Sequence, residues 1–260
     1  MTPPGFLSSV PLWLIFSVTT VCIVAAGEAG RRYGVRRSSD DRADIGSLEG
    51  AILGLLALMI GFTFSIALAR FDDRRQAVLA EANSIGTTAL RAKLLPGSIG
   101  AESIALLKEY VGLRFSVMQQ SSADEFEKIL SQSNTIQLKL WTLASKAAAA
   151  DPGMVPTGLY INSLNVMIDD QARRLAYFRA RVPDLVLMIL YAIAVVAIGF
   201  AGYADGLGNK GRQRPVRLMA TIVALALWLI QDLDRPGSGL LGTDMQPLVD
   251  VALSLDQIAG

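Results

Sequence analysis

Three long stretches of the chain carry no charged side chain: residues 6–26, 50–69 and 185–204. Each has the length, about 20 residues, that an α-helix needs to cross a bilayer core of about 30 Å. A fourth segment, 215–233, is long enough to span but contains Arg217 and Asp232, whose charges must reach the membrane edge or face protein. The sequence therefore predicts an all-α integral membrane protein with four transmembrane helices.

The composition excludes several classes of function. Hydrophobic residues make up 52% of the chain and charged residues 18%, which is typical of a membrane protein. A formal net charge of +1 provides no basic surface for nucleic acid. The chain has no histidine, and its one cysteine, Cys22, lies in the first span, so imidazole catalysis and His/Cys zinc sites are absent. We expect no enzyme, and no metal or cofactor site is predicted.

Arginines in the two short connections bear on the orientation in the membrane. The connections 27–49 and 205–217 are rich in basic residues, which places both of them in the cytoplasm by the positive-inside rule. Arginines also flank the other edge of the membrane: Arg70, Arg74, Arg75, Arg173, Arg174, Arg179 and Arg181. Because the two groups nearly cancel, the charges leave the orientation open.

The region 70–183 has mixed charge and helix-forming residues, so we expect a helical extramembrane bundle there. Pro96, Pro152, Pro156 and Pro183 mark its breaks. The predicted helices are an unbroken prolongation of the second span to about residue 93, then about 101–120, 123–150 and 157–181. The predicted division of the chain is a first transmembrane hairpin (1–69), the bundle (70–183), a second hairpin (184–236) and a tail (237–260).

The tail contains a short amphipathic segment. Leu248, Val251, Ala252, Leu255 and Ile258 share one face of a predicted helix over 248–258. Its polar face is acidic, which disfavours binding to a lipid surface, so we expect this helix to dock on the protein.

Apolar residues at intervals of four mark one side of the second span. Gly54, Leu58, Phe62 and Ile66 form this stripe, and Arg70 and Arg74 continue it beyond the membrane. Facing a symmetry axis, the stripe would form a hydrophobic neck that opens onto an anion-attracting vestibule of arginines. Close packing between helices at small residues such as Gly61, Ser65 and Ala69 is the alternative that spacing alone favours.

Charged residues gather at the membrane edge. Arg70, Asp72 and Arg74 have neighbours of both signs at helical spacing, so they form either structural ion pairs or the vestibule. Asp232, Asp234 and Arg235 end the fourth span, where charges are usually paired. We predict a partner for them among Arg70, Arg74 and the arginines of connection 27–49. Further along, Glu81, Asn83 and Arg91 form either a polar seam or a solvated helix face.

Several motifs resemble known proteins. Gly61-Phe62, followed after seven residues by Arg70-Phe71, resembles the second membrane helix of bestrophin channels. The blocks at 70–75, 81–87, 90–91 and 232–236, with Gly239, are similar to the signature of the bacterial bestrophin-like domain family. The resemblance implies a homopentamer in a bacterial inner membrane, an ion pore lined by the second span, and neck positions at Leu58 and Phe62.

The chain departs from the bestrophin pattern at several points. The neck proline is absent, Asp72 replaces the second aromatic residue after Arg70, and no acidic run matches the calcium clasp. Calcium gating is therefore not expected. Bestrophins also place the long middle segment in the cytoplasm, which opposes the orientation that the short connections favour.

Two functions remain after this comparison. The first is an oligomeric ion channel, a pentamer, whose partners are the lipid bilayer, further copies of the chain and small ions, with anions indicated by the arginines. The second is a membrane sensor or scaffold whose helical extramembrane region binds a ligand or a partner.

Overall fold

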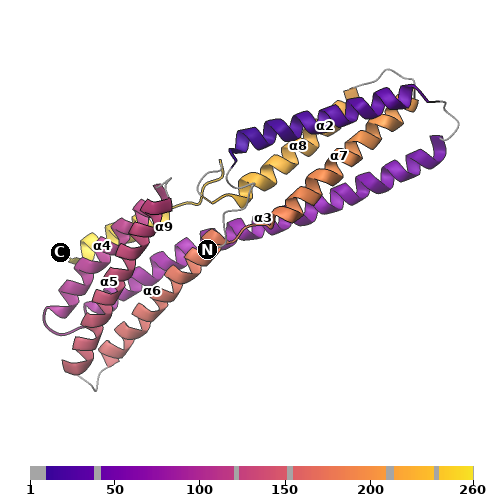
Figure 1. Cartoon of the computed structure of the whole chain (residues 1–260). Coiled ribbons are helices and arrows are strands. Elements are labelled where there is room, and N and C mark those ends of the chain that lie inside the picture. The colour runs from indigo at the N-terminus through magenta and orange to yellow at the C-terminus, as the bar shows by residue number, and fades with distance from the viewer. Residues whose placement is uncertain are drawn as a thin grey trace. The chain divides into compact units, whose positions relative to one another are not determined.

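The computed structural model describes residues 10–37, 42–119, 123–150, 155–208, 214–236 and 240–259 (Figure 1). Every regular element in these ranges is a helix, so the predicted all-α fold is confirmed. Residues 6–9 of the predicted first span and Gly239 of the family motif lie outside the described residues.

Four helices are long and apolar enough to cross a membrane, which confirms the predicted number of spans. The apolar segments of these four spans lie in α2 (Leu12–Val35), α3 (Arg42–Ala92), α7 (Asp184–Leu207) and α8 (Arg214–Asp234). The described residues form two compact units. The first lies within Met1–Phe71 and Arg181–Gly242, and the second within Asp72–Ala180 and Thr243–Gly260.

Helix α3 is one unbroken helix of 51 residues, as predicted, and contributes to both units. No proline occurs between Pro11 and Pro96, and residues 70–92 are mostly strong helix formers. The helix therefore has no reason to stop where the charge-free stretch ends at Arg70. It begins at Arg42, eight residues before the predicted start at Gly50.

Glycines bring α2 and α7 into close contact in the first unit. A Cβ atom at Gly30 would lie 1.9 Å from the carbonyl oxygen of Gly199, and one at Gly202 would lie 2.0 Å from that of Gly27. Only glycine allows two helix backbones to approach so closely. The core of this unit is completed by buried apolar residues of α2, α3, α7 and α8, among them Ile23, Leu56, Leu190, Ile198, Val223 and Leu227.

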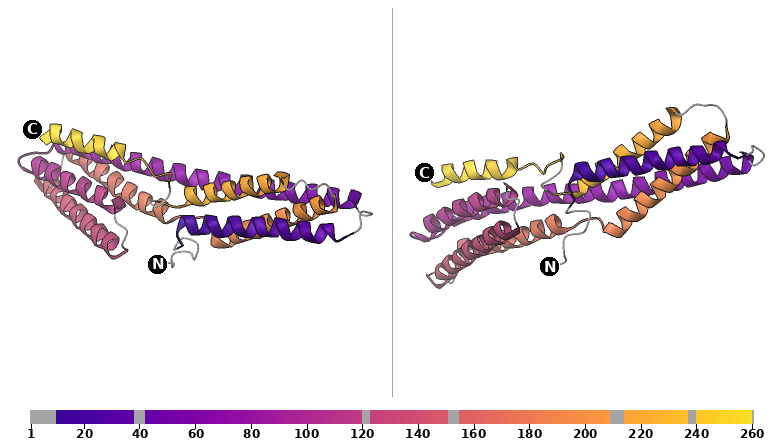
Figure 2. Two further views of the ribbon diagram at one scale, coloured as in Figure 1. Left: turned by 90° about the horizontal axis from the view of Figure 1, so that it is seen from above. Right: turned by 45° about the horizontal axis from the view of Figure 1, so that its top comes forward.

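The second unit packs α4 (Ile99–Gln119), α5 (Ala123–Ala150), α6 (Val155–Arg179) and α9 (Gln246–Ala259) with the last part of α3 (Figure 2). Its core includes Ile85, Leu107, Leu140, Leu164 and Leu255. The predicted docking of the tail on the protein is confirmed, because Leu248, Val251 and Leu255 are buried in this core. Lys108 of α4 also lies 2.9 Å from Asp256 of α9.

Candidate functional site

The four predicted neck residues lie on the exposed side of α3. Leu58 is 53% exposed in the single chain, Phe62 is 61% exposed, and Gly54 and Ile66 are exposed with them. The opposite side of the same helix is covered by its own unit, where Leu56, Thr63 and Ala67 are buried. Helix α3 therefore turns one side toward the apolar core that it shares with α2, α7 and α8, and leaves the predicted neck side uncovered by the described residues.

Small residues occupy part of this uncovered side. Gly50, Gly54, Ala57, Gly61 and Ser65 are all exposed. A Cβ atom at Gly50, Gly54 or Gly61 would meet no described atom within 4 Å. Among the described residues of one chain, the close packing that the small residues suggest thus does not occur.

The predicted vestibule residues differ in exposure. Arg70 is half-buried, and Asp72 is exposed and accepts a hydrogen bond of 2.8 Å from Gln76. Arg74 is buried. Helical geometry explains the difference, because each interval of four residues advances about 40° around a helix, which places Arg74 about 200° from Gly54. Residues at intervals of four therefore wind slowly around α3, and Arg74 no longer lies on its exposed side.

The acidic residues at the end of α8 bind backbone N–H groups. The carboxylate of Asp232 accepts hydrogen bonds from Leu240 N at 2.7 Å and from Leu241 N at 3.0 Å. Asp234 Oδ1 accepts one of 2.8 Å from Val182 N, just before α7. Both aspartates are buried, as is Arg235. These carboxylates bind the segment that follows α8 and the segment that precedes α7. An arginine partner for Asp232 and Asp234 stays a prediction.

A buried ionic cluster in the second unit was not identified from the sequence. Glu81 of α3 is fully buried, which makes the solvated-face alternative wrong for this residue. Arg114 Nε of α4 lies 2.7 Å from Glu81 Oε1, and Arg174 of α6 pairs with Glu81 Oε2. The hydroxyl of Tyr110 donates a hydrogen bond of 2.9 Å to Glu81 Oε1. One carboxylate thus joins three helices.

Amide side chains extend this cluster toward α5. Gln171 lies within 3.0 Å of the Tyr110 hydroxyl and is hydrogen-bonded to Gln137. The two other residues of the predicted polar seam lie outside the cluster. Asn83 is exposed, and Arg91 is half-buried and donates a hydrogen bond of 2.9 Å to the carbonyl oxygen of Leu159.

The electrostatics of the cluster favour a charged Glu81. Burial alone would raise the pKa of this carboxyl, but the charges of Arg114 and Arg174 and the hydrogen bonds from Arg174 and Tyr110 outweigh it, so the pKa is lowered. Burial, and then the charge of Glu81, raise the pKa of Tyr110 well above its ordinary value. Glu81 is therefore an anion that holds the bundle together.

The sequence contained a signal for this cluster. Arg114 follows Val111 by three residues, so it continues the apolar face of α4 that includes Leu107 and Val111. A charge on an otherwise apolar helix face indicates a buried ion pair when an opposite charge is within reach. The sequence does not show that α3 and α6 supply the partners.

Structural comparison finds bacterial bestrophin homologues along nearly the whole chain. A variant of a bacterial bestrophin homologue from Klebsiella pneumoniae superposes with a TM-score of 0.70 at 14% identity, covering 95% of this chain and 96% of that chain. A second variant gives a TM-score of 0.67 at 13% identity, over 95% and 97%. The structure of the homologue phased on zinc gives 0.61 at 16% identity, over 95% and 96%. These likenesses show the fold.

Comparison with curated proteins finds no match in sequence. The family described as Bestrophin-like domain matches residues 15–248. Together with its four membrane-spanning helices, this makes the chain an integral membrane protein. The chain belongs to the Bestrophin-like domain family.

Proposed function

We propose that this chain assembles into an ion channel, a homopentamer in a bacterial inner membrane with α3 around a central passage. The observation that carries the proposal is the uncovered side of α3, halfway along a membrane span, where a strip of small residues adjoins the bulky residues Leu58 and Phe62. Membership of the bestrophin-like family and the resemblance of this helix to the bestrophin neck support it.

In a ring, the strip of small residues would face a neighbouring subunit, and the bulky residues Leu58 and Phe62 would face the central axis. Taken at about 100° per residue, Gly54, Gly61 and Ser65 lie within about 40° of one another, and Phe62 lies about 80° from Gly54. Small residues allow the backbone of a neighbouring α3 to approach closely. Leu58 and Phe62 would then project beside that contact toward the axis, where a ring of apolar side chains controls conduction by excluding water.

The charges at the end of the passage favour anions. Arg70 follows Ile66 by four residues, close to where the apolar stretch of α3 ends, and is half-buried in the single chain. Repeated around a ring, this arginine would form a positively charged mouth that raises the local anion concentration.

The arginines at the other edge of the membrane and the resemblance to bestrophins favour the opposite orientation. We propose the one that the arginines of the short connections favour, with both connections in the cytoplasm. In this orientation the carboxyl terminus lies outside the cytoplasm. A reporter enzyme that is active only in the cytoplasm, fused at the carboxyl terminus, is therefore expected to be inactive. An active fusion would reverse the assignment.

Planar-bilayer recording of the purified oligomer tests the channel. The wild-type protein is expected to conduct, and Leu58→Ala or Phe62→Ala is expected to raise the conductance or open probability because the smaller side chains admit water to the neck. Leu225→Ala is the matched control, since Leu225 is a similarly exposed leucine on α8, outside the proposed neck. A verified oligomer that does not conduct, or that conducts equally with Phe62→Ala, would refute the proposal.

A further inference from the structure

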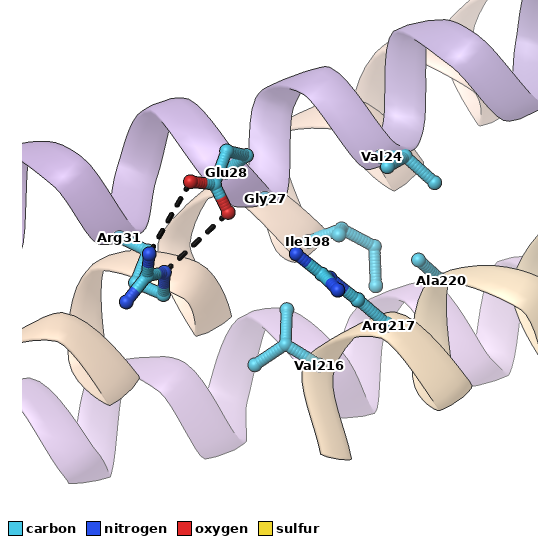
Figure 3. A pocket seen from close by; sticks show the side chains of 8 residues that line it. All are labelled: Val24, Gly27, Glu28, Arg31, Ile198, Val216, Arg217 and Ala220. Atoms are coloured by element: carbon cyan, nitrogen blue, oxygen red, sulfur yellow. Dashed lines mark hydrogen bonds and ion pairs between the residues drawn. The ribbon is translucent and has the colours of Figure 1, made fainter. Parts of the chain in front are cut away.

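A small pocket lies between α2, α7 and α8 in the first unit (Figure 3). Its volume is about 140 Å³, which is the space of about four or five water molecules. Val24, Ile198, Val216 and Ala220 give it apolar walls, and Glu28, Arg31 and Arg217 give it charge. The pocket thus joins an apolar surface to a charged group of side chains.

The charged residues of the pocket lie at the edge of the membrane. Glu28 and Arg31 follow the end of the charge-free stretch 6–26, and Arg217 comes just before the charge-free residues 218–230 of α8. Since the structure brings these residues to one pocket, the charge-free part of α2 ends at the same level at which the charge-free part of α8 begins. Lipid headgroups occupy this level of a bilayer.

The carboxylate of the pocket is already paired within α2. Arg31 Nη2 lies 3.3 Å from Glu28 Oε1, and Arg32 Nε lies 3.1 Å from the same oxygen. The Glu28–Arg31 pair is drawn with dashed lines in Figure 3. Glu28 is therefore matched by arginines of its own helix, which leaves the charge of Arg217 unbalanced.

The guanidinium of Arg217 has no hydrogen bond or ion pair with any residue that the structure describes. The side chain extends from α8 into the space between α8 and α2 (Figure 3). Arg217 is exposed in the single chain and lies at the level of the lipid headgroups, so its charge is accessible to an anion of the membrane surface. A small anion that enters the pocket would therefore meet this guanidinium.

We propose that this pocket binds the phosphodiester of an anionic membrane phospholipid. Arg217 and Arg31 would contact the phosphate oxygens, for which guanidinium groups are well suited, and the acyl chains would continue along the apolar surface that includes Val24 and Val216. Basic pockets between membrane helices recognise anionic headgroups through this combination of charge and apolar surface. The inference does not depend on ion conduction, because it concerns a surface of one chain.

Titration of lipid onto the purified full-length protein in detergent, read by native mass spectrometry, tests the proposal. The probes are phosphatidylglycerol, phosphatidylcholine with the same acyl chains, and soluble glycerol phosphate. The wild-type protein is expected to retain phosphatidylglycerol in preference to phosphatidylcholine and to be indifferent to glycerol phosphate. If glycerol phosphate at a similar concentration displaced phosphatidylglycerol, the site would bind a free phosphate, and the proposal of a lipid ligand would be refuted.

Two substitutions separate the pocket from general surface charge. Arg217→Gln is expected to weaken phosphatidylglycerol binding about fivefold, the effect of one basic residue near an anionic lipid. Arg36→Gln removes the same charge from an exposed arginine at the end of α2 that does not line the pocket, and is expected to leave binding unchanged. Equal weakening by both variants, or no weakening by Arg217→Gln, would contradict the proposal.

A third substitution tests the shape of the pocket without changing a charge. Val216→Trp places a large side chain in the pocket and is expected to weaken phosphatidylglycerol binding while every arginine remains. The elution volume of each variant in detergent checks that its assembly is intact. Unchanged binding in a correctly assembled Val216→Trp variant would show that the lipid lies elsewhere.

Discussion

Arg114 Nε lies 2.7 Å from Glu81 Oε1, and this buried contact joins α4 to α3 in the second unit. Arg174 of α6 binds the other oxygen of the same carboxylate. Removing one member of a buried ionic cluster leaves the others without partners in a place that water does not reach. The cluster therefore makes the bundle depend on a single acidic side chain.

Glu81→Gln is expected to lower the free energy of unfolding by about 3 kcal/mol or more, because two buried guanidinium groups lose their counter-ion. For a chain of this size the loss corresponds to a fall in Tm of about 6 °C or more. Circular dichroism of the full chain in detergent measures it. Asp256→Asn is the control, because it breaks the solvent-exposed pair with Lys108 and is expected to cost less than about 1 kcal/mol. Equal Tm values for the two variants would contradict this role of Glu81.

The stability of the bundle is also expected to fall in acid. The pKa of Glu81 in the folded protein is lowered from its ordinary value of 4.5, so its contribution is complete above about pH 4.5 and disappears as the pH falls through the folded pKa. The difference in Tm between wild type and Glu81→Gln is the measurement, since other carboxyl groups titrate in both proteins. The difference should shrink below about pH 4.5. A constant difference down to the point of acid unfolding would exclude Glu81 as its source.

Gly202→Ala is expected to destabilise the first unit. The added Cβ would lie 2.0 Å from the carbonyl oxygen of Gly27, and two helix backbones have to separate to admit it. Overpacking of this kind costs about 1–3 kcal/mol. Gly112→Ala on α4 is the control: its Cβ meets nothing within 4 Å, and alanine favours a helix by up to about 1 kcal/mol. Thermal unfolding that is unaffected by Gly202→Ala would show that α2 and α7 do not pack in this way.

A disulfide at position 65 is expected to link two copies of the chain. Ser65→Cys is made in a Cys22→Ala background, because the native cysteine is exposed on α2. If the small residues of α3 pack against a second α3, oxidation in membranes yields a covalent dimer on denaturing gels, since disulfides form only when the two Cα atoms come within about 7 Å. Leu225→Cys in the same background controls for random collisions between lipid-facing residues. Equal amounts of dimer from both variants would refute the contact.

The sequence predicted the helices well and their packing poorly. Charge-free stretches locate the membrane spans, prolines mark the breaks between helices, and the amphipathic face of α9 indicated that it docks. Glu81 was harder, because an acidic residue at helical spacing has the same pattern on a solvated face and in a buried cluster. Only the pairing of α3 with α4 and α6 distinguishes the two.

Two further features show the same limit. Gly27, Gly30 and Gly34 have the same spacing as Gly199, Gly202 and Gly206, but the match has meaning only once α2 and α7 are known to pair. The backbone N–H groups of Leu240 and Leu241, which the structure gives to Asp232 as donors, were not predicted, and the expected arginine partner stays a prediction. Backbone donors have no sequence signature.

A density map of the purified particle in a lipid nanodisc determines whether the uncovered side of α3 faces other copies of the chain. We expect a ring of five subunits in which Leu58 and Phe62 point into a central passage and Gly61 contacts the neighbouring α3. Phe62 in contact with lipid, or subunits without a passage between them, would contradict it.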